Sequence, residues 1–320
     1  MQRQSSPKPD GIPATFPQAI AHRGYSALFP ENSMAAFRAA VEVGAHAIET
    51  DLHLSRDGVI VLSHDSTLKR CFGDPRKVAE CEWEALSTLR TLRGPVQPMA
   101  RLLDLLEYLA GPGVEEIWIL LDIKKTDDPR IMCAQLAKTI ARVPSERPWD
   151  ERIILGAWQA EWVAACHLHL PGFPVALTTA FPAYASAMLA VPGLHFSVLN
   201  YALATQRGSR LRARARAQGR RIFSWPDNAD EWMARSIRCQ ADGVITDDPG
   251  RFLALCEQWQ QDAVRRKAGR STPREAVLWV GVNLLVWVLE LVEFLREGSP
   301  RERVRRVLGS IHSDGEGISS

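Results

Sequence analysis

The sequence predicts an α/β protein built on a closed barrel of eight parallel strands, each followed by a helix. Two observations predict this fold. Short apolar runs alternate with segments of helical length and spacing, which favours a parallel sheet with helices packed outside it. Eight such units occupy about 240 residues, the typical extent of a (β/α)8 or TIM barrel. An open doubly wound sheet is the alternative architecture.

The expected strands begin at residue 18 and end at residue 246. They are QAIAH (18–22), HAIETDL (46–52), IWILLDIK (117–124), RIILGAW (152–158), PVALTT (174–179), HFSVLN (195–200), RRIFSW (220–225) and DGVIT (242–246). The first helical segment carries Ser33 at its start and Gly44 at its end, which are helix-capping signals. A second segment of the same character begins at Arg101.

One interval interrupts the alternation after the second strand. The run VIVLSHD (59–65) follows Asp57-Gly58, a pair that favours a hairpin turn, and a polar stretch then continues to Pro98. We expect an insertion over about residues 53–98, with this run pairing locally beside the second strand. Such an insertion would cover the carboxyl end of the barrel.

Global composition gives few indications of a partner. The net charge is only +2 and the apolar and charged fractions are ordinary, so neither a nucleic-acid partner nor overall disorder is expected, and no obligate protein partner is evident. The six cysteines lack zinc-ligand spacing and the polar start lacks a signal-peptide apolar region. The sequence therefore predicts an intracellular protein that is not secreted, with a flexible arm over residues 1–16 and one barrel domain over residues 17–258.

Polar residues gather where the predicted strands end. In a TIM barrel these carboxyl ends and their loops meet at one mouth, which is where catalytic residues lie. The residues concerned are His22 and Arg23 on the first strand, Glu49 and Asp51 on the second, Asp122 and Lys124 on the third, and Trp225 on the seventh. His64 ends the run in the insertion.

The three carboxylates predict a metal site. Glu49 and Asp51 point to one side of their strand because side chains alternate with period two, and Asp122 faces the same mouth. Three converging carboxylates repel one another unless a cation lies between them, and oxygen ligands without cysteine suit Mg²⁺ or Ca²⁺. Arg23 and Lys124 would then favour an anionic substrate, with phosphate as the best match. The alternative is a set of solvated acids at the strand ends.

Two histidines at the same mouth indicate proton transfer. A phosphodiester needs a base to activate the nucleophile and an acid to protonate the leaving oxygen, and imidazole titrates near neutral pH. His22 and His64 fit these two roles, and the sequence leaves their assignment open. Trp225 is either a substrate platform or a core residue.

The ordered series AHRG, PEN, E-x-D, DG followed by HD, and D-x-K resembles the glycerophosphodiester phosphodiesterase family over roughly Gln18 to Phe252. The resemblance implies a TIM barrel with a small insertion after the second strand. By the same resemblance, the implied roles are an acid-base pair of His22 and His64, metal ligands Glu49, Asp51 and Asp122, phosphate contacts Arg23 and Lys124, and loop support from Glu31 and Asn32. One departure is Trp225-Pro226-Asp227-Asn228, where the family usually has Trp-Thr-Val-Asn.

A basic and apolar segment, residues 259–308, follows the barrel. Residues 276–296 read AVLWVGVNLLVWVLELVEFLR, include Trp279 and Trp287, and have clusters of lysine and arginine on both flanks. These features predict a helix that dips into one leaflet of an anionic membrane, with the two tryptophans in contact with lipid. A single-span tail anchor and a helix packed on the barrel are the alternatives. Residues 309–320 are expected to be disordered.

The tail and the motifs together suggest a substrate. Within the family, HRGY, PEN, IETDL and LDIK with an apolar tail look most similar to the fungal phosphatidylglycerol-specific phospholipase C. That resemblance implies cleavage of phosphatidylglycerol to diacylglycerol and glycerol 3-phosphate at an intracellular membrane of the endoplasmic reticulum, a lipid droplet or a mitochondrion. The alternatives are a glycerophosphodiester phosphodiesterase or lysophospholipase D acting on deacylated or lyso substrates, and a catalytically silent membrane adaptor.

Overall fold

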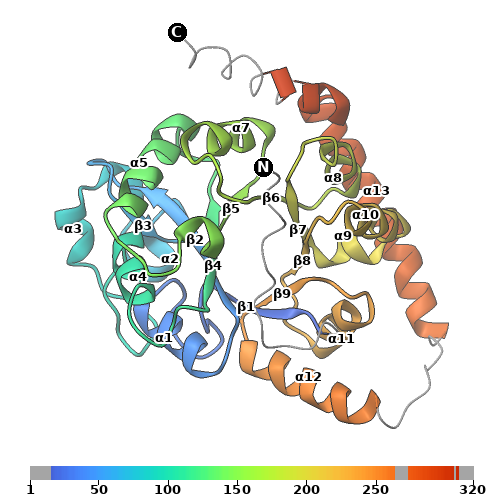
Figure 1. The fold of residues 1–320 in the computed structure, drawn as a ribbon, viewed down its shortest axis with the longest axis horizontal. Coiled ribbons are helices and arrows are strands. Elements are labelled where there is room, and N and C mark those ends of the chain that lie inside the picture. Colours follow the sequence, from blue (N-terminus) through green and yellow to red (C-terminus); the bar gives the residue numbers. More distant parts are fainter. Residues whose placement is uncertain (1–15, 264–272, 306–307, 310–320) are drawn as a thin grey trace.

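Eight parallel strands form a closed barrel in the computed structural model, which describes residues 16–263, 273–305 and 308–309 (Figure 1). The strands are β1 (Gln18–His22), β2 (Ala47–Leu54), β4 (Trp118–Ile123), β5 (Ile153–Ala157), β6 (Val175–Thr179), β7 (His195–Leu199), β8 (Ile222–Trp225) and β9 (Gly243–Thr246). They pair in the order β1-β2-β4-β5-β6-β7-β8-β9, and β9 returns to β1. The closure confirms the predicted barrel over the open sheet.

Helices surround the barrel (Figure 1). They are α1 (Met34–Glu42), α4 (Leu102–Leu109), α5 (Pro129–Ala141), α6 (Trp149–Arg152), α7 (Ala160–His169), α8 (Pro182–Met188), α9 (Asn200–Ala204), α10 (Gln206–Ala217), α11 (Asp230–Arg238) and α12 (Pro249–Ala263). The predicted cap of α1 is confirmed, because the Ser33 side chain accepts a hydrogen bond from the Ala36 amide. This cap fixes the path of the loop that carries Arg23 into the mouth.

The insertion after β2 has a core of its own. Strand β3 (Ile60–Leu62) pairs with β2 in antiparallel register, which confirms the predicted local hairpin. The stretch expected to be merely polar also contains α2 (Lys69–Phe72), the 3-10 turn η1 (Val78–Glu80) and α3 (Trp83–Ser87). The buried side chains that hold these pieces together are Val61, Leu68, Val78, Leu86 and Met99. This small core fixes the segment that carries His64.

The C-terminal helix α13 (Pro273–Glu297) packs one face against the barrel helices. Val282 and Val286 are buried, and Glu290 accepts a hydrogen bond from the Ala183 amide at 2.7 Å and pairs with Arg207. One face of α13 is therefore packed on the barrel, as the alternative prediction had it. Trp287 lies on another face and is half exposed. No helix in the described ranges is long and apolar enough to cross a membrane.

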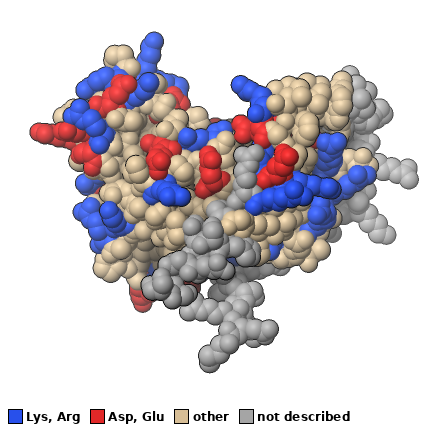
Figure 2. All heavy atoms as spheres, turned by 90° about the horizontal axis from the view of Figure 1, so that it is seen from above, with Lys and Arg blue, Asp and Glu red and all other residues tan. Residues whose placement is uncertain are grey.

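Several expectations lie outside the described residues. These are the arm up to residue 15, the basic stretch 264–272, the side chain of Trp279, and the tail from residue 310. Figure 2 shows cationic and anionic side chains interspersed over the face that it presents, consistent with the small net charge.

Candidate active site

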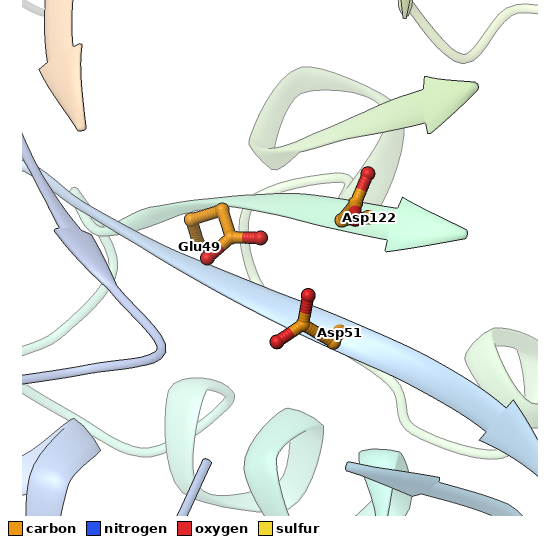
Figure 3. Close-up of side chains that lie close together, drawn as sticks. All are labelled: Glu49, Asp51 and Asp122. Atoms are coloured by element: carbon orange, nitrogen blue, oxygen red, sulfur yellow. The ribbon is translucent and has the colours of Figure 1, made fainter. Parts of the chain in front are cut away.

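Three buried carboxylates converge inside the barrel mouth. Asp51 of β2 and Asp122 of β4 are partners in the strand ladder, and Glu49 lies one inward-facing position below Asp51. Each residue offers an oxygen, and these oxygens all lie within 4.8 Å of one another (Figure 3). The three residues are 5%, 1% and 6% exposed for Glu49, Asp51 and Asp122. The expected cluster is therefore assembled by the fold.

Two cations face this cluster. Lys124 Nζ lies 2.6 Å from Asp51 Oδ1 and 2.5 Å from Asp122 Oδ2. Arg23 Nε lies 3.4 Å from Asp51 Oδ2, and the Arg23 amide donates to Glu49 Oε2 at 3.1 Å. Arg23 adopts a left-handed backbone conformation with φ 56°, which turns the chain sharply at the end of β1 and brings this amide to the carboxylate.

The electrostatics of the cluster fit a divalent cation. Burial, and next the Asp51 carboxylate, raise the pKa of Glu49 to about 8. Burial opposes ionisation of Asp51 too, but Lys124 and Arg23 outweigh it and hold its pKa below the usual value. Without a metal, the cluster thus favours retaining a proton on Glu49. Glu49, Asp51 and Asp122 could hold a divalent cation, which would add to the positive charge of Lys124 and Arg23 and favour the ionised form of Glu49.

His22 is oriented by a carboxylate that the sequence analysis did not single out. Its Nδ1 lies 2.6 Å from Asp247 Oδ1, and its Nε2 lies 3.9 Å from Glu49 Oε2. Burial lowers the pKa of His22, but the hydrogen bond to Asp247 and the charge of Glu49 outweigh it, so the net pKa is raised. Asn228 donates to the other Asp247 oxygen at 2.7 Å. With Nδ1 engaged, Nε2 is the atom available for proton transfer.

His64 is held from the insertion. Its Nδ1 lies 2.7 Å from Asp65 Oδ1, and Arg70 of α2 donates to Asp65 Oδ2 at 2.7 Å. Arg70 also binds Glu31 through two hydrogen bonds of 2.6 and 2.8 Å, and Glu31 accepts from Arg23 at 3.0 Å. Glu31 therefore links the insertion to the loop after β1, which is the loop that it was predicted to support.

Asn32 supports the acidic residues of β2 through its side chain. Its side-chain amide donates to Asp51 Oδ2 at 2.8 Å and accepts from the Thr50 hydroxyl at 2.7 Å. Asn32 is buried, with φ 54°. These two bonds fix the direction in which Asp51 presents its second oxygen.

A cavity of about 140 Å³ collects the predicted side chains. Its lining includes His22, Arg23, Glu49, Asp51, His64, Asp122, Lys124 and Trp225. Trp158 is a further wall residue, and its indole ring packs edge-on against Trp225 with centroids 5.5 Å apart. Trp158 Nε1 donates to Asp122 Oδ1 at 2.8 Å. Trp225 is thus part of the cavity wall and not only of the core.

The residues at this site that were not predicted as site residues include Trp158, Asn228 and Asp247. Asp247 directly follows β9, so the strand-end rule that selected Asp122 could have selected it as well. Asn228 is the last residue of the segment Trp225-Pro226-Asp227-Asn228, which differs from the usual family sequence. Its side chain bonds to both the carboxylate and the backbone amide of Asp247, so this loop lies beside the residue that orients His22. Trp158 ends the expected strand RIILGAW, so the rule that selected Trp225 could have selected it too, whereas its bond to Asp122 depends on the fold.

Comparison with known proteins agrees with this geometry. The sequence model of the Glycerophosphoryl diester phosphodiesterase family matches residues 22–251. A glycerophosphodiester phosphodiesterase of Caldanaerobacter subterraneus subsp. tengcongensis is 26% identical over 242 residues, which cover 74% of this chain and 96% of that protein.

Solved structures show the same fold. A crystal structure of a protein described as a putative glycerophosphoryl diester phosphodiesterase from Silicibacter pomeroyi superposes with a TM-score of 0.70 at 22% identity, covering 77% of this chain and 95% of that one. A phosphodiesterase of Oleispira antarctica, in complex with the product sn-glycerol-3-phosphate, gives a TM-score of 0.65 at 18% identity and covers 76% of this chain and 97% of that one.

A TIM barrel with two carboxylate-paired histidines and an acidic cluster at its mouth is the framework of a phosphoric diester hydrolase, and this chain is such an enzyme. The chain belongs to the glycerophosphoryl diester phosphodiesterase family, because the family model spans most of its length.

Proposed function

We propose that the chain hydrolyses glycerophosphodiesters to glycerol 3-phosphate and an alcohol, with Mg²⁺ or Ca²⁺ as cofactor. The observation that carries this proposal is the single cavity in which His22 and His64 flank the cluster of Glu49, Asp51 and Asp122. The Caldanaerobacter relative that covers most of the chain bears the name of this activity.

The residues suggest a division of labour. One histidine takes the proton of the substrate's glycerol 2-hydroxyl, which attacks phosphorus, and the other protonates the leaving alcohol oxygen. Water then opens the cyclic phosphate with the two roles reversed. Arg23 and Lys124 bring positive charge to the phosphate oxygens. A bound divalent cation would lower the pKa of the hydroxyl and stabilise the charge that develops on phosphate.

The test of the cyclic route uses paired substrates. Purified protein is incubated with a glycerophosphodiester and with its 2-deoxy analogue, each with a divalent metal. We expect glycerol 3-phosphate from the first substrate and no turnover of the second. Normal turnover of the deoxy analogue would exclude attack by the 2-hydroxyl.

A second candidate substrate is intact phosphatidylglycerol, presented by an anionic membrane. The observation that favours it is the outward face of α13, where nine large apolar side chains are between 41% and 74% exposed. They are Leu284, Leu285, Trp287, Val288, Leu289, Leu291, Val292, Phe294 and Leu295. An apolar surface of this extent is typical of a membrane or protein contact.

The position of α13 relates this surface to the mouth. Asn283 accepts a hydrogen bond from the Gln206 amide, and Glu290 accepts one from the Ala183 amide. Ala183 and Gln206 follow β6 and β7 closely in the chain, so both contacts lie toward the carboxyl ends of these strands. A lipid surface on the outward face would therefore lie beside the mouth, with Trp287, and on the sequence prediction Trp279, as contact residues.

Vesicle experiments test this second candidate. We expect the full chain to float with phosphatidylglycerol vesicles, and Leu284→Ser/Leu295→Ser to lose flotation and lipid turnover while turnover of a soluble glycerophosphodiester persists. A variant that retains both lipid activities would contradict the membrane role of α13. Products restricted to soluble or lyso substrates would contradict phosphatidylglycerol as the substrate.

A further inference from the structure

Two hydroxyl groups line the catalytic cavity on the side away from the carboxylates. Thr178 of β6 and Ser197 of β7 are partners in the strand ladder, so their side chains enter the barrel side by side. In the closed ring of eight strands, β6 lies four positions from β1 and β7 lies four positions from β2. The hydroxyls therefore lie across the barrel from His22 and Glu49.

These hydroxyls have no hydrogen-bond partner within the described part of the chain. Thr178 is 6% exposed and Ser197 is 2% exposed. Because both side chains line the cavity, a hydroxyl there without a protein partner is free to hydrogen-bond to water or to a ligand. Leu120 and Ile245 add apolar surface to the same cavity, and Trp225 of β8, the strand next to β7, contributes a buried Nε1 donor without a hydrogen-bond partner among the described residues.

The space between the hydroxyls and the metal-binding cluster is open. Gly156 of β5 is the ladder partner of Asp122, and β5 lies between β4 and β6. A Cβ atom added at Gly156 would lie 3.3 Å from Asp122 Cα and 3.5 Å from Asp122 Oδ1. Because glycine has no side chain, β5 places no side chain between Asp122 and Thr178 at Gly156, and Trp158 just beyond the strand forms the cavity wall above it.

We propose that Thr178 and Ser197 form a subsite for the terminal hydroxyl of the substrate's glycerol group, and so select polyol phosphodiesters over those that lack this hydroxyl. A hydroxyl pair can both donate to and accept from an alcohol. A site built to bind a hydroxyl discriminates against an analogue without it, because its own polar groups would remain unpaired. This inference rests on the proposed glycerophosphodiesterase activity and specifies which part of the substrate the barrel reads.

The test compares two substrates that share a 4-nitrophenyl leaving group and the reactive 2-hydroxyl. One is glycerol 3-(4-nitrophenyl phosphate), and the other is its 1-deoxy analogue, a propane-1,2-diol ester. We expect wild-type kcat/KM to favour the glycerol ester by about 4- to 100-fold, since two hydrogen bonds of about 2- to 10-fold each are at stake. Release of 4-nitrophenolate is followed at saturating divalent metal.

The variants Thr178→Val and Ser197→Ala should each lower kcat/KM for the glycerol ester about 2- to 10-fold and leave the deoxy ester unchanged. Thr178→Ser keeps the hydroxyl and should retain the wild-type preference. Thr179→Val is the matched control, because the Thr179 hydroxyl accepts from the Phe181 amide outside the cavity.

Equal losses on both substrates would assign Thr178 and Ser197 a structural role and overturn the inference. An unchanged preference in Thr178→Val and Ser197→Ala would overturn it as well. An inactive wild-type enzyme on both esters would instead overturn the proposed activity, and the subsite with it.

Discussion

The bond between His22 and Asp247 gives the sharpest prediction for mechanism. In Asp247→Asn the 2.6 Å contact loses its negative charge, while the size of the side chain is kept. A hydrogen bond to a charged group contributes about 1.5–3 kcal/mol, which corresponds to a loss of about 10- to 150-fold in kcat. We expect a loss in this range, because the imidazole also loses the partner that fixes its tautomer.

The pH dependence of the same variant distinguishes the two histidine roles. The Asp247 carboxylate raises the pKa of His22, so its removal must lower that pKa. If His22 is the general acid, it must be protonated, and the alkaline limb of the kcat/KM profile moves to lower pH. If His22 is the general base, the acidic limb moves to lower pH. The profile is measured on a soluble glycerophosphodiester at saturating divalent metal.

Asp248→Asn provides the matched control. Asp248 neighbours Asp247, accepts from the Tyr25 hydroxyl at 2.9 Å, and caps α12 through the Arg251 amide. Asparagine caps helices about as well as aspartate, so we expect near wild-type activity from this variant. If Asp247→Asn matched this control in both rate and pH profile, the assignment of His22 to proton transfer would be refuted.

Three further outcomes follow from the site and its surroundings. Glu49→Gln should abolish turnover and leave the circular dichroism spectrum unchanged, because it removes an oxygen of the metal cluster; substantial residual activity would refute the metal assignment. EDTA should abolish turnover and excess divalent metal should restore it, whereas a silent adaptor would show no metal-dependent turnover to lose. Burial raises the pKa of Asp227 from 3.8 to about 6, so the unfolded state loses this proton first as pH rises. The free energy of unfolding should therefore fall by about 2 kcal/mol between pH 4 and 6, and Asp227→Asn should remove that part of the slope in urea titrations; an unchanged slope would contradict the buried, raised-pKa state.

The barrel was predictable because each of its strands is a short apolar run bounded by turn or helix signals. The residues of β2 illustrate the limit of such reasoning, since alternation placed Glu49 and Asp51 on one face but could not give their distance from Asp122. That distance depends on the ladder register of β2 and β4, which is a tertiary property.

The rest of the site depends on contacts between residues far apart in the chain. His22 and Asp247 are 225 residues apart in the sequence. Trp158, at the end of β5, donates a hydrogen bond to Asp122 on the neighbouring strand β4. The helix predicted over residues 276–296 is confirmed as part of α13, but the pairing of its Glu290 with Arg207 depends on how the helix packs on the barrel. The local sequence pattern shows which side chains can take part in catalysis, but their hydrogen-bond partners are determined by the tertiary fold.

Product analysis with a soluble glycerophosphodiester tests the central claim most directly. Purified full-length chain is incubated with glycerophosphoglycerol, with and without Mg²⁺ or Ca²⁺, and the phosphorus products are identified by ³¹P NMR. We expect glycerol 3-phosphate only when the divalent metal is present, and none from Glu49→Gln. Hydrolysis that persists in EDTA, or no hydrolysis with either metal, would contradict it.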